Sequence, residues 1–195
     1  MKKLTYIFLT GVFYLLGCGG GRDSADPIQK GWSAFESGEF YESRDIFLNI
    51  YLDNPNDAEA AHGLSWSLLR MDSVSRAVTM FESSEGALPP EDVTGGYTFA
   101  LSAKKMYNES NTQADILINA SPTWTFTHGS EINVIDIYIV KSANYFALGN
   151  YPASLNSIKM VNASFSADVT TASGRSSLAA EIERLRGLNK VNISE

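Results

Sequence analysis

The sequence predicts an all-α fold in which helical hairpins repeat along the chain and stack into a solenoid. The same interval, about 34 residues, separates Trp32 from Trp66 and Phe47 from Phe81. Within both copies, apolar residues recur at spacings of three and four, as in amphipathic helices. Bulky and small residues also follow one another in the same order in the two copies. A shared period of this length is typical of a repeated supersecondary unit.

Length and composition limit the classes of protein to consider. The chain has 195 residues, of which 44% are hydrophobic, enough for one compact domain or one short solenoid. Its formal net charge is −7, and its lysines and arginines form no cluster. Nucleic-acid phosphates require such a cluster, so the composition argues against a nucleic-acid partner.

Residues 1–17 are predicted to be a signal peptide. Lys2 and Lys3 precede an almost unbroken apolar run over 4–16, which is shorter than the roughly 18 residues of a membrane-spanning helix. The run ends in Leu15-Leu16-Gly17-Cys18. This sequence resembles the bacterial lipobox, and the resemblance implies diacylglycerol on the sulfur of Cys18 and cleavage before it. The alternative is that Cys18 is an unmodified thiol at the end of an uncleaved anchor.

A lipid on Cys18 would place the mature chain in the bacterial cell envelope. The resemblance implies a second acyl chain, which makes anchoring stable, whereas a single chain binds only marginally. Gly19 after the cysteine indicates the outer membrane, and the side of that membrane stays open. The chain has no other cysteine, so no disulfide is expected. Residues 18–25, rich in glycine at their start, are predicted to form a flexible tether.

The first predicted hairpin covers residues 26–55. Asp26 is suited to cap a helix over 26–37, with proline at the next position as its first residue. Gly38 interrupts this helix, and a second helix is predicted over 40–54 before Pro55.

This hairpin resembles a tetratricopeptide repeat, in which small residues lie where two antiparallel helices cross and large ones fill the gap to the next pair. The resemblance is carried by Gly31, Ala34, Gly38, Phe40, Ser43, Phe47 and Pro55, and in the second copy by Ser65, Leu68, Asp72, Val74, Ala77 and Phe81. The second copy departs from the pattern at Asp72, which replaces the turn glycine. The connection that follows the second pair, over 83–90, is therefore expected to be longer and less regular than the one after the first pair.

The resemblance implies a right-handed superhelical solenoid of about four helix pairs over 26–188, with a tail over 189–195. The third pair is predicted as a helix over 91–107 and a short partner over 113–119, with Ala114 placed after Ala77 as the equivalent small residue. In the fourth pair, residues 147–154 resemble the turn at 38–43.

The last predicted helix is amphipathic, with apolar residues on one face and charges on the other, and it suits a cap over the end of the stack. Its apolar residues are Leu178, Ala179, Ile182, Leu185 and Leu188. Residues 162–173, which precede it, are polar and are predicted to form a loop.

Residues 123–140 give conflicting signals. Thr123 to Thr127 alternate in polarity, and 132–140 are rich in β-branched residues, which taken alone indicates a β-hairpin. The run continues into the repeat-like turn at 147–154, and helices fit the rest of the chain. We therefore expect a buried first helix of the fourth pair here.

The sequence shows no constellation for chemistry. Its two histidines, His62 and His128, have no metal-ligand spacing. No serine lies in a nucleophile elbow, and no glycine-rich phosphate loop is present. No metal, cofactor or catalytic site is therefore predicted.

The repeat register predicts a partner-binding surface. In tetratricopeptide repeats the first helix of each pair lines the concave face, and the alignment puts Trp32 and Trp66 at equivalent positions there. Glu36 and Arg70 follow one turn later, and His62 lies on the same helix as Trp66. Two neighbouring indoles would form an aromatic floor for a peptide. The alternative is that both indoles simply fill the space between helix pairs.

Three hypotheses about function follow. The first is a lipid-anchored scaffold or adaptor that binds a protein or peptide in the envelope, without catalysis. The second is a surface or periplasmic binding protein for a small ligand such as a glycan fragment, with Trp32, Trp66 and Trp124 as stacking platforms. The third, an enzyme, lacks a recognisable set of converging titratable residues.

Overall fold

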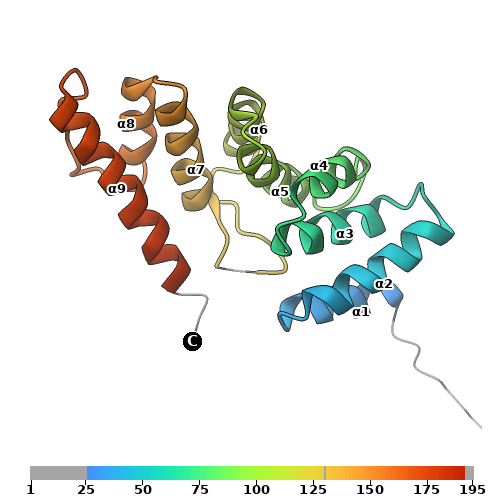
Figure 1. The fold of residues 1–195 in the computed structure, drawn as a ribbon. Helices are drawn as coiled ribbons and strands as arrows, with labels where there is room; N and C mark the ends of the chain where they lie inside the picture. Colours follow the sequence, from blue (N-terminus) through green and yellow to red (C-terminus); the bar gives the residue numbers. More distant parts are fainter. Residues whose placement is uncertain (1–25, 130, 192–195) are drawn as a thin grey trace, which may run out of the picture.

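The computed structural model describes residues 26–129 and 131–191, and this part of the chain is all-helical apart from one isolated β-bridge (Figure 1). The helices are α1 (Pro27–Glu36), α2 (Phe40–Asp53), α3 (Ala58–Arg70), α4 (Val74–Glu82), α5 (Pro90–Ala103), α6 (Tyr107–Ala120), α7 (Val134–Ala147), α8 (Tyr151–Lys159) and α9 (Ala172–Val191).

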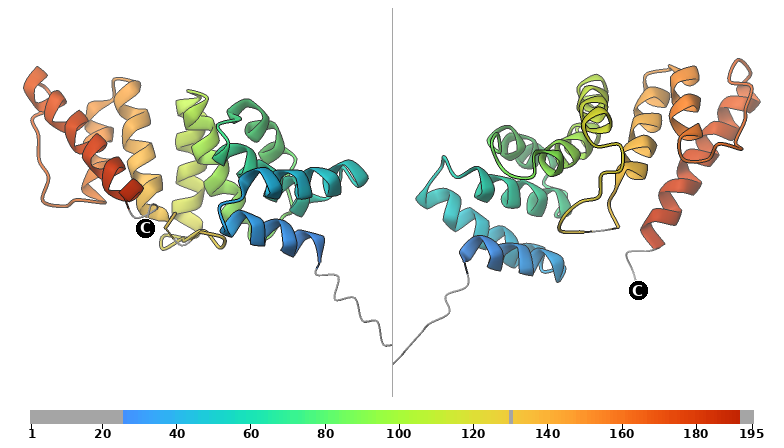
Figure 2. Two further views of the ribbon diagram at one scale, coloured as in Figure 1. Left: turned by 60° about the horizontal axis from the view of Figure 1, so that its bottom comes forward. Right: turned by 180° about the vertical axis from the view of Figure 1, so that it is seen from behind.

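The helices form four sequential pairs followed by a single helix. Each first helix contacts its own partner and also the first helix of the next pair, so α1, α3, α5, α7 and α9 form a continuous row. Within the described residues, successive second helices do not contact one another. First helices therefore lie on the inner side of the arc in Figure 2, and second helices lie on the outer side. The predicted solenoid of four pairs with a terminal helix is confirmed.

In the first two pairs, the first helix is capped by the aspartate that directly precedes it. The Asp26 side chain accepts a hydrogen bond from the Ile28 N–H at 3.1 Å, and proline opens α1. Asp57 caps α3 in the same way through the N–H of Ala60. The α4–α5 connection is longer than the α2–α3 connection, as predicted, and Pro89 precedes α5 as its N-cap residue.

A residue in the left-handed region occurs at every tight turn within a pair. These residues are Gly38, Asp72, Lys105 and Gly149, with φ of 79°, 56°, 65° and 74°. A left-handed φ strains side chains with a Cβ, least for aspartate and asparagine. The turns at Asp72 and Lys105 therefore carry strain that glycine would remove.

We expect Lys105→Gly to raise the free energy of unfolding by roughly 0.5–1 kcal/mol, because relief of left-handed strain exceeds the entropic cost of glycine. Asp72→Gly should change it by less, since aspartate tolerates this conformation. Urea unfolding followed by circular dichroism measures both. Gly38→Ala, the reverse change at the equivalent turn, should lower stability, and a rise there would contradict the strain argument.

The predicted bounds of the third pair were wrong. Its second helix begins at Tyr107, not at 113, and its first helix ends at Ala103, not at 107. The turn residue is Lys105, whose side chain gives no turn signal in the sequence. The small residue five positions after each turn is Ser43, Ala77, Ser110 and Ser154, and all four are fully buried. Ser110, not Ala114, is thus equivalent to Ala77.

The helix expected from residue 123 begins only at Val134. Asn133 caps it, in a reciprocal capping box with Asp136, so the helix cannot extend further back. Residues 121–129 and 131–133 instead belong to a long connection, in which Thr125 and Asn133 make an isolated antiparallel bridge. The β-like pattern of Thr123 to Thr127 therefore describes this short bridged loop, and the β-branched run after Val134 is helical.

Glycines let the first two pairs approach closely. A Cβ on Gly31 would lie 2.6 Å from the Phe47 ring, and one on Gly63 would lie 2.2 Å from it. The Phe47 ring therefore fills a gap between α1 and α3 that only glycine leaves open. Ser43 Oγ and Ser67 Oγ are 2.8 Å apart beside it and satisfy each other in the core.

The terminal helix α9 packs on α7 and α8 through a second apolar cluster that includes Leu178, Ile182 and Leu185. Its buried Glu181 accepts two hydrogen bonds from Arg184 and one from Asn162 at 2.8 Å. These contacts tie the loop before α9 to the helix. They also hold the pKa of Glu181 below its ordinary value, chiefly through Arg184.

Glu181 should stabilise the fold only while its carboxyl is ionised. Because its folded-state pKa is lowered, its contribution is present above the unfolded pKa of about 4.3 and is lost as pH falls through the folded value. The difference in Tm between wild type and Glu181→Gln should therefore be largest at neutral pH and shrink below about pH 4. Glu183→Gln, an exposed neighbour, is the control. A pH-independent difference would contradict the charge argument.

The predictions for the signal peptide, Cys18 and the tether lie outside the described residues. At the other end, α9 reaches Val191, so residues 189–191 of the predicted tail are helical. Among the described residues, no helix is both long and apolar enough to cross a membrane.

Candidate functional site

Four residues occupy equivalent positions along the inner row of helices, each six residues before the left-handed turn residue of its pair. They are Trp32 on α1, Trp66 on α3, Phe99 on α5 and Ala143 on α7. The sequence alignment therefore placed both tryptophans correctly on first helices.

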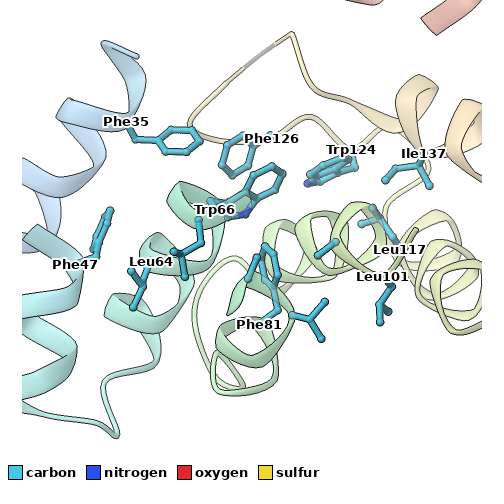
Figure 3. Close-up of a cluster of buried hydrophobic side chains, with 14 of the residues drawn as sticks. Phe35, Phe47, Leu64, Trp66, Phe81, Leu101, Leu117, Trp124, Phe126 and Ile137 are labelled. Atoms are coloured by element: carbon cyan, nitrogen blue, oxygen red, sulfur yellow. The ribbon is translucent and has the colours of Figure 1, made fainter. Parts of the chain in front are cut away.

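The first half of this row is covered by the chain itself. Residues 121–129 and 131–133, termed here the covering segment, extend from the base of α7 toward α3 (Figure 1). Phe126 stacks on Trp66 with ring centroids 4.0 Å apart, and His128 stacks on Trp32 at 3.7 Å (Figure 3 shows the first contact). Both indoles are buried, with exposed fractions of 6% for Trp32 and 1% for Trp66.

The third aromatic contact of the covering segment is made by Trp124, which lies against α5. Its ring occupies the space that a Cβ on Gly95 would enter, at 2.5 Å. The indole N–H donates to Asp92 Oδ1 at 2.7 Å, and the backbone N–H of Thr127 donates to Asp92 Oδ2 at 3.1 Å. Asp92 is fully buried, and its backbone oxygen accepts from the Trp66 indole. Asp92 thus joins α3, α5 and the covering segment.

The predicted polar residues of the surface are engaged in the same contact. His128 Nδ1 donates to the Glu36 carboxylate at 2.7 Å, and Arg70 lies 3.9 Å from Glu131. His62 is buried under Trp32 at 5.1 Å between ring centroids, and neither ring nitrogen has a hydrogen-bond partner. His62 Nδ1 is 4.0 Å from the carboxylate of Glu59. The nearby His62 lowers the pKa of Glu59 most, partial burial opposes this shift, and the backbone N–H of Leu88, which donates to Glu59 at 2.6 Å, lowers the pKa further.

The aromatic floor predicted for a partner is therefore not open. Trp32, His62 and Trp66 are interior residues, as the alternative interpretation of the two indoles proposed. Trp124 is buried as well, at 4% exposure, so the glycan hypothesis has no exposed indole to use as a platform. These tryptophans are buried because the aromatic side chains of the covering segment, which precedes α7, pack over the first half of the inner row.

The second half of the inner row is open. A groove of about 460 Å³ lies between α5, α7 and α9, and we term it the open groove. Its apolar lining includes Phe99, Val140, Phe146 and Ile182. The buried Asn144, which also lines the groove, accepts a hydrogen bond from the Ser102 hydroxyl and donates to Ser110 Oγ and Asn111 Oδ1. These hydrogen bonds link α5, α6 and α7.

Sequence reasoning missed Phe99, Phe146 and Asp92. The signal that could have found the covering segment is the spacing of the turns, which is nearly constant from Gly38 to Lys105 and then lengthens before Gly149. The extra residues fall between α6 and α7. Alternating aromatic residues in such an insertion indicate a segment that packs against something, and here that is the neighbouring repeats.

The described residues contain no group of His, Cys, Asp or Glu side chains that could hold a metal ion. The buried polar groups are engaged with one another inside the fold, except for His62 and the Asn111 amide nitrogen.

No protein family and no curated protein matches this sequence. Solved structures with a similar fold do exist. MamA MSR-1 is 15% identical, with a TM-score of 0.57 over 70% of this chain and 73% of that one. The MamA RS-1 ArsTM double mutant is 11% identical, with a TM-score of 0.55 over 87% and 76%.

A tetratricopeptide repeat protein from Parabacteroides merdae ATCC 43184 is also similar, with 16% identity and a TM-score of 0.51 over 85% of this chain and 57% of that one. At these identities the likeness is one of fold. Together with the four helix pairs and their equivalent turn residues, it shows that this chain has a tetratricopeptide-like, all-helical solenoid fold.

Proposed function

We propose that this chain is a lipid-anchored scaffold or adaptor of the bacterial cell envelope, which binds a protein or peptide partner and has no catalytic activity. The observation that carries the proposal is the open groove on the inner row of helices. Tetratricopeptide-like stacks present such extended concave surfaces for partners. The apolar lining of the groove, from three separate helices, suits side chains of a partner.

Energetics favour the open groove over the covered half as the binding site. Trp124 and Phe126 are almost fully buried. Aromatic side chains bury about 150–250 Å² each, so at roughly 25 cal/mol per Å² their removal from the core costs on the order of 8 kcal/mol. That equals the entire binding free energy of a complex with a Kd of about 1 μM. A partner therefore cannot displace the covering segment at moderate affinity, and it needs a surface that is already free.

The anchor half of the proposal rests on the lipobox-like sequence that ends in Cys18. The first described helix, α1, lies at one end of the arc, far from α9 (Figure 2). An eight-residue tether spans at most about 28 Å. A lipid at Cys18 would therefore hold the module near the membrane by its N-terminal end and leave the open groove accessible.

Site-specific crosslinking in a bacterial host tests the scaffold function. A photoreactive amino acid is placed at Ala103 or Ala147, which are exposed residues of the groove lining. Ala180 on α9 is the control, because it is exposed and lies outside the lining. We expect a discrete protein adduct from both groove positions and none from Ala180. The absence of adducts from the groove, or the same adducts from Ala180, would overturn the scaffold assignment.

Metabolic labelling with a fatty-acid analogue tests the anchor separately. Wild type should incorporate the label and remain in the membrane fraction, whereas Cys18→Ser should lose the label and leave that fraction. Lys2 and Lys3 are unchanged in this variant, so export is expected to proceed. An unlabelled wild-type chain would remove the lipid anchor from the proposal while leaving the scaffold test unaffected.

A further inference from the structure

The outer side of the solenoid has a hollow between the second helices of the first two pairs. Both α2 and α4 pack on α3, and within the described residues they do not contact each other, so a valley remains over α3. Its volume is about 400 Å³, within the range of roughly 300–1,000 Å³ for small-molecule sites. We term it the outer hollow. Second helices lie on the outer side of the arc in Figure 2, so the outer hollow is separate from the open groove.

Most of the lining of the outer hollow is apolar. It comes from three helices and consists of Leu48, Tyr51, Leu52, Leu64, Leu68 and Met80. The two leucines of α3 are almost fully buried, whereas Leu52 on α2 is largely exposed. Apolar surface is thus left in water at the rim of a concave, apolar site. A hydrocarbon chain in the hollow would cover this surface, and its burial is favourable.

The polar lining comes from α4 alone and consists of Ser75, Arg76 and Thr79. The Arg76 guanidinium makes no hydrogen bond or ion pair with any other described residue. Two other arginines in this half of the chain are engaged, because Arg44 pairs with Asp45 and Arg70 lies 3.9 Å from Glu131. Arg76 is therefore a cation at the rim whose charge is available to an anionic group of a ligand.

The charge at the outer hollow is opposite in sign to that of its surroundings. Residues 26–103 contain 13 aspartates and glutamates and only four lysines and arginines. None of these carboxylates lines the hollow, and Arg76 does. Exposed charges more than about 8 Å away are largely screened at physiological ionic strength, so the charge within the lining decides which head group is favoured. That charge is positive.

We propose that the outer hollow binds a free fatty acid, with its hydrocarbon chain over Leu64 and Leu68 and its carboxylate beside Arg76. A methylene group has about the volume of a water molecule, roughly 30 Å³, so 400 Å³ holds one chain of about 12 carbon atoms. The two long chains of a phospholipid do not fit. This site goes beyond the scaffold function, which uses the inner side of the solenoid, and does not depend on it.

Photolabelling tests the site in the full-length chain. The chain is placed in phosphatidylcholine nanodiscs and irradiated with dodecanoate that has a diazirine at the end of its chain, and labelled residues are identified by mass spectrometry. We expect saturable labelling of the lining residues, and unlabelled dodecanoate should displace the probe. Octanoate and decanoate should compete less well, by about fourfold per missing methylene at equal free concentration in water.

Receptor variants locate the hydrocarbon chain. Leu52→Glu removes apolar surface from the rim and adds a negative charge, so labelling should fall at least tenfold. Ile116→Glu on α6 is the matched control, because Ile116 is also an exposed aliphatic residue and lies outside the lining. It should change labelling less than twofold. Both positions are exposed, so circular dichroism should show unchanged folding.

A neutral ligand of the same length tests the role of the cation. Dodecanol should compete less well than dodecanoate in wild type. Arg76→Gln should weaken competition by dodecanoate about threefold, as expected for an exposed ion pair, and leave competition by dodecanol unchanged. Lys30→Gln is the control, because Lys30 is an exposed cation of α1 outside the lining. It should affect neither ligand.

Labelling that is equal in wild type and Leu52→Glu, or that falls outside the lining, would overturn the proposal. So would the absence of saturable labelling up to about 100 μM free acid. Equal competition by dodecanol and dodecanoate in wild type would reject the anionic head group, and with it the fatty acid. Labelling of the same residues by a photoreactive phosphatidylcholine that dodecanoate does not displace would assign the hollow to a membrane lipid instead.

Discussion

Phe126→Ala is expected to lower the free energy of unfolding by about 3–5 kcal/mol, the range for removal of a buried phenylalanine. The Phe126 side chain is 1% exposed and contacts the rings of Trp32, Phe35 and Trp66. Its loss leaves a cavity on the inner row and admits water to Trp66. Urea unfolding measures the stability, and a red shift of tryptophan emission measures the exposure of the indole.

Tyr41→Ala is the matched control, because Tyr41 is an aromatic residue with 70% of its surface exposed. Its loss should change stability by less than about 0.5 kcal/mol and leave the emission maximum in place. A cost below about 1 kcal/mol for Phe126→Ala would contradict the permanent role of the covering segment. In that case Trp32 and Trp66 would again be available to a partner.

Capping and turn residues that are close in sequence were sufficient to predict where most helices lie. Asp26, Pro27 and Gly38 set the two ends of α1 by capping and turn geometry within a few residues of chain. The turn at Gly149 is recognisable for the same reason. These signals act between neighbours in sequence, so a single sequence contains all the information they need.

The third pair lacked such a signal because Lys105 adopts the left-handed conformation that glycine adopts at equivalent turns. Across this turn, Ser110 Oγ donates a hydrogen bond to the backbone oxygen of Thr98 at 2.8 Å. That contact depends on the two helices already lying side by side. Composition alone could not show it, and the helix start was therefore placed too late.

The candidate site depends on contacts between distant parts of the chain. The repeat register correctly located Trp32 and Trp66 on the inner row, but the side chain that covers Trp32 is His128, and its partner Glu36 is 92 residues away. Helical periodicity cannot reveal a contact at that separation. The insertion before α7 was visible only as an irregular repeat spacing, which has no meaning until the neighbouring turns are located.

Asp92 should be the polar residue on which the covering segment depends most. We expect Asp92→Ala to lower the free energy of unfolding by about 3 kcal/mol, because it leaves the buried indole N–H of Trp124 without an acceptor, at roughly 1–3 kcal/mol, and also removes the acceptor of the Thr127 N–H, which water can partly replace. Asp92→Asn should cost less, about 2 kcal/mol, since an amide keeps one acceptor and directs its own N–H group toward the second donor. Urea unfolding measures both changes.

Glu91→Gln is the control for Asp92, because it alters the adjacent acidic residue of the same first turn of α5. Its effect should stay within about 0.5 kcal/mol. The order of the three variants distinguishes explanations. If alanine and asparagine cost the same, the loss would come from the negative charge, whereas a larger cost for alanine reports the number of unsatisfied donors. An effect of Asp92→Ala no larger than that of Glu91→Gln would mean that Trp124 and Thr127 find other acceptors, and that apolar packing alone holds the covering segment on the inner row.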